Sequence, residues 1–205
     1  MHIRLEEEKD FRTVENLTRE AFWNKDRPGC TEHYVLHRFR SRADFIKELD
    51  YVIEQDGQIV AHIMYCTAML TPDSGPQREV ITFGPVSVLP AMQGMGLGTK
   101  LITYTLEKAA QMGYGAVAIT GNPQYYHRFG FKSGAAHGVY YAPAPRSEAA
   151  PFFMVKELAC GYLNGFCGTY QDPEGYQTND EEVQEFDAAF PAKAKKVLPG
   201  QLPTE

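Results

Sequence analysis

The spacing of apolar residues predicts several amphipathic helices. Apolar positions recur every three or four residues in 11–22, 31–40 and 97–109, which is the period of a helix with one buried face. Asp10 precedes the first stretch and is a residue type favoured at helix N-caps, and Gly113 follows the third at the expected C-terminus. Shorter helical segments are predicted at residues 43–47, 124–129 and 180–189.

Runs of apolar and β-branched residues predict strands between these helices. They cover residues 2–5, 49–53, 59–70, 79–88, 116–120 and 152–158, and the last of these is expected to be the final strand along the chain. Asp56-Gly57 is a strong hairpin signal, so the three strands between residues 49 and 88 should form an antiparallel meander. A strand, a helix and a second strand make a right-handed crossover, so 116–120 should run parallel to 79–88. This order predicts a mixed α/β (α+β) fold.

The character of the chain changes near residue 158. Residues 159–205 are rich in glycine, proline and acidic residues, and hold eight acidic residues against three lysines. They contribute −5 of the net charge of −6, which leaves residues 1–158 near neutral. We expect a folded domain at residues 1–158 and an acidic C-terminal extension at residues 159–205.

Composition and charge narrow the expected partners. With 43% apolar and 22% charged residues, the 205-residue chain has the composition of an ordinary globular protein. A near-neutral body offers no basic field for nucleic acid. The longest charge-poor run, residues 57–71, is too short to span a bilayer, and residues 1–8 lack the apolar region of a signal peptide. We therefore expect no nucleic acid, no membrane and a cytoplasmic location.

The cysteines and histidines show no metal-ligand spacing. None of the four cysteines forms a Cys-x-x-Cys pair, and the six histidines are scattered along the chain. We expect no metal, and reduced thiols in a cytoplasm.

A glycine-rich segment carries the clearest chemical signal. Gln93-Gly94-Met95-Gly96-Leu97-Gly98-Thr99 opens the central helix directly after the strand at 79–88. Glycines let backbone amides approach an anion, and the N-terminus of a helix adds unpaired N–H groups and a positive dipole end. The segment therefore predicts a phosphate or pyrophosphate site, with a tight turn that binds nothing as the alternative.

Two common nucleotide motifs do not fit this segment. A Walker loop needs Gly-Lys-Ser/Thr, but the order here is Gly98-Thr99-Lys100. A dinucleotide fingerprint needs its third glycine one residue later and an acid after the next strand, where this chain has Gly121-Asn122.

A third family fits both halves of this region. The run from Val86 to Gly98 closely resembles the acetyl-CoA motif of the GCN5-related N-acetyltransferase (GNAT) family, a hydrophobic strand followed by Gln/Arg-x-x-Gly-x-Gly/Ala. The later run Asn122-Pro123-Gln124-Tyr125-Tyr126-His127-Arg128-Phe129-Gly130-Phe131 places a tyrosine four residues before a Gly-Phe pair, as family members commonly do. Within the family the chain is similar to the YhbS type of predicted acetyltransferases.

This resemblance implies a fold and an activity. The fold is a GNAT-like, mainly antiparallel sheet of about six to seven strands, flanked by helices and containing one parallel β-α-β crossover. The activity is transfer of an acetyl group from acetyl-CoA to a primary amine, in a small molecule or a peptide, by direct attack in a ternary complex. A catalytically silent acyl-CoA-binding module and a purely structural or interaction protein are the alternatives.

The expected contacts with acetyl-CoA come from the family motif and from Gly84-Pro85, which interrupts the strand at 79–88. Pro85 cannot donate to a ladder, so with Gly84 it predicts a bulge or splay that frees the backbone of Val86 and Val88 for the amides of pantetheine. The pyrophosphate is expected on the loop residues Gln93, Gly94, Met95, Gly96, Leu97, Gly98 and Thr99. The resemblance makes Asn122 a contact to the acyl carbonyl or to pantetheine, with a turn-forming asparagine as the alternative.

Tyr126 is the expected catalytic residue, as the acid that protonates the departing CoA thiolate. It is expected to open the short helix after the parallel strand, while Tyr125 packs or faces away; a packing role for Tyr126 is the alternative. The base stays open, because a water chain could deprotonate the amine. Its candidates are Glu20, Glu32, His33, His62 and Glu79.

The extension holds apolar residues that could pack onto the body or onto a second subunit, which leaves a homodimer open. They are Tyr162, Leu163, Phe166, Tyr170, Phe186 and Phe190.

Overall fold

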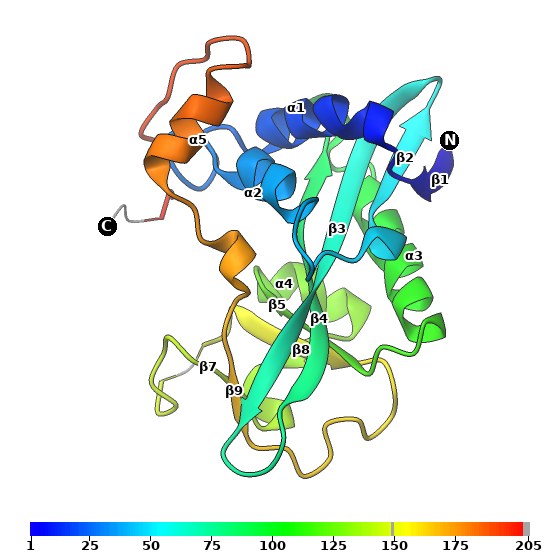
Figure 1. Ribbon diagram of the computed structural model, residues 1–205, viewed down its shortest axis with the longest axis vertical. Helices are drawn as coiled ribbons and strands as arrows, with labels where there is room; N and C mark the ends of the chain where they lie inside the picture. The colour runs from blue at the N-terminus through cyan, green and yellow to red at the C-terminus, as the bar shows by residue number, and fades with distance from the viewer. Residues whose placement is uncertain (149, 203–205) are drawn as a thin grey trace. The chain divides into compact units, whose positions relative to one another are not determined.

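The computed structural model describes residues 1–148 and 150–202 and is shown in Figure 1. The chain forms two compact units. The first contains Met1–Met64, Gly84–Leu101 and the chain from Glu174 onward, and the second contains Tyr65–Phe83 and Ile102–Pro173. Two strands and one helix run from one unit into the other along the chain, and each unit is described by itself.

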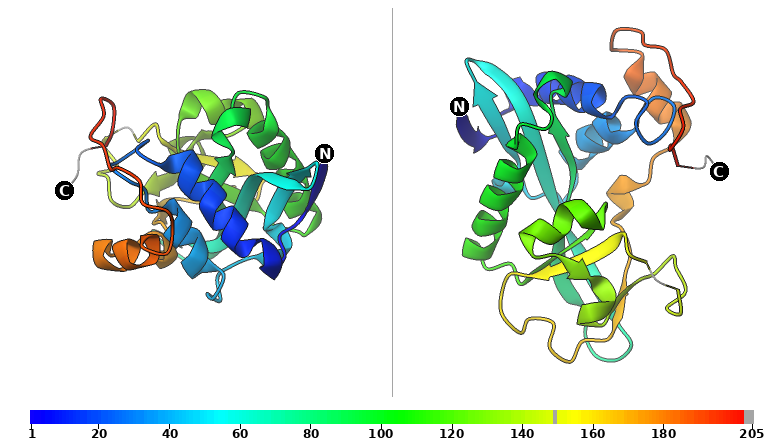
Figure 2. Two further views of the ribbon diagram at one scale, coloured as in Figure 1. Left: turned by 90° about the horizontal axis from the view of Figure 1, so that it is seen from above. Right: turned by 180° about the vertical axis from the view of Figure 1, so that it is seen from behind.

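The first unit combines a small antiparallel sheet with three helices. Strands β1 (His2–Leu5), β2 (Tyr51–Gln55) and the beginning of β3 (Gln58–Pro72) pair antiparallel. Helices α1 (Phe11–Phe22) and α2 (Glu32–Phe39) pack against each other, as both views of Figure 2 show. The third helix is α5 (Asp180–Asp187), which contacts α2.

The predicted hairpin joins β2 to β3. Asp56 has φ 51° and Gly57 has φ 77°. Two consecutive positive φ angles are the mark of the two-residue turn that suits the twist of a hairpin.

The second unit contains the parallel crossover. Strand β4 (Arg78–Val88) is followed by helix α3 (Leu97–Gln111) and strand β5 (Ala116–Thr120), and β5 runs parallel to β4 with Ile81 opposite Val117. Strand β8 (Phe153–Glu157) pairs antiparallel with all five residues of β5. The predicted mixed fold and its crossover are confirmed.

The described residues form nine strands, more than the six or seven expected. The additional short strands are β6 (Lys132–Ser133), β7 (Val139–Tyr141) and β9 (Gly168–Tyr170). The expectation that the strand at 152–158 is the final one is wrong, because β9 follows it and pairs antiparallel with β3 and parallel with β7. Strands of two or three residues are too short to show a period in the sequence.

The short helices are shifted from their predicted places. The turn expected at 43–47 lies at Lys47–Leu49, and the one expected at 124–129 is helix α4 (Pro123–Tyr126) continued by the 3-10 turn His127–Phe129. Helix α5 confirms the helix predicted from residue 180.

The extension supplies apolar side chains to both units. Leu163, Phe166 and Tyr170 belong to the buried core of the second unit, and Phe186 and Phe190 pack in the first. The domain boundary between residues 158 and 159 stays a prediction. Residues 149 and 203–205, which fall inside the two predicted regions, lie outside the described residues. No helix in the described part of the chain is both long and apolar enough for a membrane span.

Candidate functional site

The glycine-rich segment forms an open loop before α3. Gly94 has φ 77° and Gly96 has φ 82°, and a Cβ at either position would have no neighbouring atom within 4 Å. The glycines are therefore needed for their backbone conformation and leave an unobstructed surface. The Lys100 N–H donates to the Gly96 carbonyl at 3.0 Å, as the helix begins. The N–H groups of the residues before Lys100 lie at the helix N-terminus, where an anion binds best.

Both ends of the loop are held in place, one by burial of a side chain and the other by a hydrogen bond. Leu97 is buried, whereas Met95 is 66% exposed. The Gln93 side-chain amide donates to the Val88 carbonyl at 3.2 Å, which ties the loop to the end of β4. The side chain of Gln93, predicted as a cofactor contact, thus already has a partner inside the protein.

At the end of β4, Ser87 is more deeply buried than its neighbours Val86 and Val88. Ser87 is buried, and its hydroxyl lies 2.8 Å from that of Thr18. Val86 and Val88 are half-buried, so their side chains pack partly into the core, and the contact of their backbone with pantetheine stays a prediction. Alternation along a strand turns successive side chains to opposite faces, and here the serine faces inward. Gly84 has φ 143°, and Pro85 offers no N–H.

Asn122 caps the helix that follows β5. It is exposed, and its side-chain oxygen accepts a hydrogen bond from the Gln124 N–H at 3.0 Å. This is the bond of an N-cap residue. The turn-forming alternative is confirmed, and the contact with a cofactor stays a prediction.

Tyr126 lies in an aromatic cluster of the second unit. It ends α4, so the expectation that it opens the helix is wrong. Its ring covers Gly121, where a Cβ would collide with it, and lies 5.9 Å from the Phe83 ring and 6.0 Å from the Phe131 ring. Burial raises the pKa of the Tyr126 hydroxyl to about 12. The phenol therefore keeps its proton at neutral pH, as a proton donor must.

Tyr125 packs on the surface of the same helix, as predicted. Its ring lies 5.6 Å from the Phe129 ring, and the Arg128 guanidinium stands 4.8 Å from its centre.

The acidic candidates for the base are occupied by structural contacts or lie exposed. Glu20 accepts a hydrogen bond from the Lys193 ammonium at 2.7 Å. Glu32 accepts from the Thr31 N–H at 2.9 Å, and burial raises the pKa of its carboxyl. Glu79 is exposed. None of these contacts identifies a base.

The two histidine candidates are buried. Nε2 of His33 lies 3.1 Å from the Asp187 carboxylate, and Nε2 of His62 lies 2.7 Å from that of Asp50. Burial lowers the pKa of both imidazoles to about 4, so both are neutral at physiological pH.

A buried polar cluster that the sequence analysis missed surrounds His62. Glu6, Asp50 and His62 place one potential ligand atom each within 4.8 Å of one another. The Arg40 guanidinium donates to both oxygens of Glu6 at 2.7 and 3.1 Å. Because this guanidinium occupies both oxygens of Glu6, whose pKa burial raises to about 8, we assign the cluster no metal. The members are up to 56 positions apart, so no spacing signal could have revealed them.

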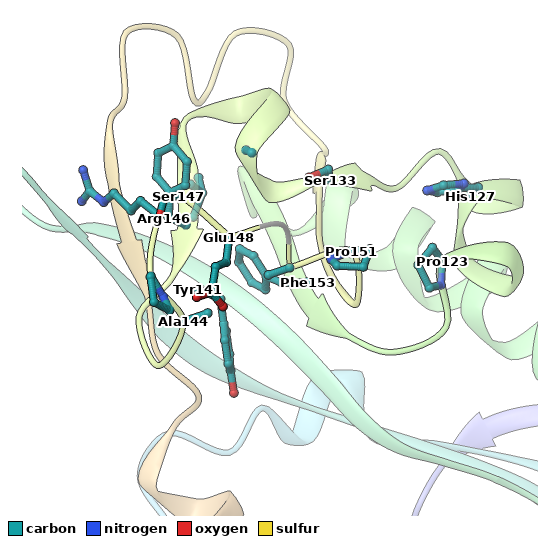
Figure 3. Close-up of a pocket in the computed structure, with 15 residues that line it drawn as sticks. Pro123, His127, Ser133, Tyr141, Ala144, Arg146, Ser147, Glu148, Pro151 and Phe153 are labelled. Carbon is teal, nitrogen blue, oxygen red and sulfur yellow. The ribbon is translucent and has the colours of Figure 1, made fainter. Parts of the chain in front are cut away.

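The second unit also holds a pocket of about 340 Å³, shown in Figure 3. Tyr141 and Phe153 form part of its wall, with Glu148 from the loop between β7 and β8 and His127 from the turn after α4. Its size suits a small molecule. None of the predicted cofactor or catalytic residues is among its lining residues.

The chain matches one protein family over most of its length. The family described as "Acetyltransferase (GNAT) domain" matches residues 2–134. The N-acetyltransferase YhbS of Escherichia coli K12 is 29% identical over 177 residues, which covers 86% of this chain and 98% of YhbS.

Two solved structures are similar over nearly the whole chain. The crystal structure of E. coli YhbS in complex with CoA has a TM-score of 0.72 at 26% identity, and the match covers 85% of this chain and 91% of that one. A GNAT acetyltransferase from Brucella melitensis, in complex with acetyl-CoA, has a TM-score of 0.67 at 26% identity, covering 86% and 97%.

Proposed function

The chain belongs to the GNAT family of acetyltransferases and is an acyltransferase, and from that premise we propose that it moves an acetyl group from acetyl-CoA to a primary amine. The observation that carries the proposal is the open glycine loop at the N-terminus of α3. Two similar proteins hold CoA or acetyl-CoA in their crystal structures, which supports the same donor here.

The donor is proposed to lie along the end of β4 and the loop. The pyrophosphate binds the backbone from Gln93 to Thr99, where the helix N-terminus favours an anion. The two amides of pantetheine pair with the backbone of Val86 and Val88. The Val88 carbonyl has two lone pairs, so it can accept a pantetheine N–H beside the Gln93 amide. Asn122 contacts the acyl end.

The reaction is proposed to be direct attack within a ternary complex. The amine nitrogen forms a bond to the thioester carbon, the bond from that carbon to sulfur breaks, and CoA departs with the electron pair as a thiolate. Tyr126 donates a proton to this thiolate and is reprotonated from solvent. The amine gives its own proton to water.

The raised pKa of Tyr126 limits what this acid contributes. Proton transfer from a phenol of pKa about 12 to a thiolate whose acid has a pKa of about 8.5 is uphill by about 5 kcal/mol. At the reference pKa of tyrosine it would be uphill by only about 2 kcal/mol. The contribution should therefore lie at the low end of general acid catalysis, about 100-fold or less.

An acetyl-transfer screen tests the proposal. The full chain is incubated with acetyl-CoA and a panel of polyamines, amino sugars and peptides with free N-termini, and released CoA thiol is measured. Amine-dependent release supports transfer. Calorimetric binding of acetyl-CoA without release for any amine would favour a silent acyl-CoA-binding module instead, and no binding would refute the donor site.

A further inference from the structure

The C-terminal extension brings a tyrosine to the middle of β4 in the first unit. Tyr176 ends a 3-10 turn, η6 (Glu174–Tyr176), and its hydroxyl donates to the Gly84 carbonyl at 3.0 Å. Its ring packs edge-on against Phe39 of α2, with centroids 4.8 Å apart. The hydroxyl oxygen would lie 3.9 Å from a Cβ at Gly84.

The turn that carries Tyr176 is anchored to α2 and to the residues after it. Gly175 is buried, and any Cβ there would collide with the Phe39 ring. The Arg38 guanidinium donates to the Gln177 carbonyl, and Arg42 lies 3.5 Å from the Glu174 carboxylate. Tyr176 is therefore held against Gly84 by the fold of the first unit, without any help from a ligand.

Gly84 marks the level at which the acyl group of the donor would lie. A strand rises about 3.3 Å per residue, so Val88 and Val86 lie about 6.6 Å apart, and Gly84 follows Val86 along β4 beyond the cis Gly84–Pro85 peptide bond. If the two amides of pantetheine pair at Val88 and Val86, the thioester comes one further step along, at Gly84. The acyl chain then extends beyond the thioester, beside the Tyr176 ring.

We propose that Tyr176 is a specificity-determining residue, which closes the acyl end of the donor site and restricts the donor to short acyl chains. The inference rests on the proposed function, since it uses the proposed path of pantetheine. The ring fills space that added methylenes would need, and its hydrogen bond to the Gly84 carbonyl resists the ring swinging aside. An acidic extension outside the GNAT match thereby contributes a wall of the site.

Calorimetry with acetyl-CoA, propionyl-CoA and butyryl-CoA tests this on the full chain. The wild-type protein should bind butyryl-CoA at least tenfold more weakly than acetyl-CoA, since each methylene in a closed pocket discriminates by about tenfold or more. Tyr176→Leu keeps an apolar contact with Phe39 but cannot reach Gly84, and should bring the two affinities within about threefold. Tyr176→Phe keeps the ring and loses only the hydrogen bond, so its ratio should lie between these values.

Gln177→Ala is the matched control, because it changes the exposed residue next to Tyr176 and keeps the backbone carbonyl that Arg38 contacts. It should keep the wild-type ratio. Acetyl-CoA binding with equal affinity for butyryl-CoA in the wild type, or an unchanged ratio in folded Tyr176→Leu, would overturn this inference and leave the proposed function standing. Absence of acetyl-CoA binding in the wild type would overturn both.

Discussion

At the scale of single residues, burial raises the pKa of the Tyr126 hydroxyl, whose position the sequence motif predicted. The aromatic neighbours that raise its pKa also hold the ring in place. A role as acid and a role as packing aromatic are therefore distinguished only by removing the hydroxyl.

Tyr126→Phe keeps the ring and removes that hydroxyl. We expect kcat to fall about tenfold to 100-fold, because the thiolate leaves without a proton donor, with little change in acetyl-CoA affinity. Steady-state kinetics and calorimetry measure the two quantities. Tyr125→Phe is the control and should match the parent; the reverse result would shift the assignment by one residue, and two silent variants would remove any chemical role for the phenol.

Gly96→Asp tests the loop at the same scale. A carboxylate on this open surface would repel the pyrophosphate, so CoA should bind more than tenfold more weakly, a loss of about 1.4 kcal/mol or more. Calorimetry measures it. Gly75→Asp in the turn between β3 and β4 is the control, since Gly75 also has a positive φ of 93° and open space for a Cβ. Equal CoA affinity in a folded Gly96→Asp protein would reject the site.

At the scale of elements, helix α5 contacts α1 through an ion pair between a buried arginine and a half-buried aspartate. Arg19 is 1% exposed, and its guanidinium donates to both oxygens of Asp187 at 2.5 and 3.2 Å. The Phe190 ring beyond the helix packs beside His33 at 5.3 Å. The extension thereby buries the Arg19 guanidinium and supplies the carboxylate that balances its charge.

Asp187→Ala should leave Arg19 buried without its carboxylate. Removing one partner of a buried pair is costly, and we expect the free energy of unfolding to fall by about 3 kcal/mol, measured by denaturant titration. Glu181→Ala on the exposed face of the same helix should change it by less than about 0.5 kcal/mol. Similar small effects of both substitutions would show that the pair contributes little.

At the scale of the whole molecule, burial of His33 makes stability depend on pH. The pKa of His33 is lowered to about 4 by burial, against about 6.5 in an unfolded chain. Between these values the unfolded state binds more protons, so stability falls as the pH decreases through this window.

From pH 7.5 to pH 5 this one group should cost about 2 kcal/mol of the free energy of unfolding. Denaturant titrations at the two pH values measure the change, and His33→Gln, which cannot titrate, should reduce it by that amount. An unchanged pH dependence in His33→Gln would show that His33 is not the titrating group.

Truncation after Gly161 tests the extension as a whole. It removes β9 and α5, together with core residues of both units, so the melting temperature should fall or the oligomeric state should change, while the CoA site should stay intact. Truncation after Val197, which removes only the last eight residues, is the control and should change either property little. An unchanged melting temperature and an unchanged mass in solution after the longer truncation would refute a packing role.

The elements with local signals could be predicted from the amino-acid sequence alone. The helix at Phe11–Phe22, the strand at Ala116–Thr120 and the Asp56-Gly57 turn lie where period and turn chemistry placed them. The glycine loop was also predictable, because the backbone conformation and the helix start are encoded within seven consecutive residues. Family resemblance added the donor to that local signal.

Features made by residues far apart in the chain could not be predicted from the sequence and became visible only in the folded protein. Strand β9 exists because β3 and β7 pair with it, and Ser87 faces inward because Thr18 offers a partner. Tyr176 reaches Gly84 across 92 positions of sequence. Such contacts depend on how the elements pack. The local sequence around one residue of a distant pair does not identify its partner.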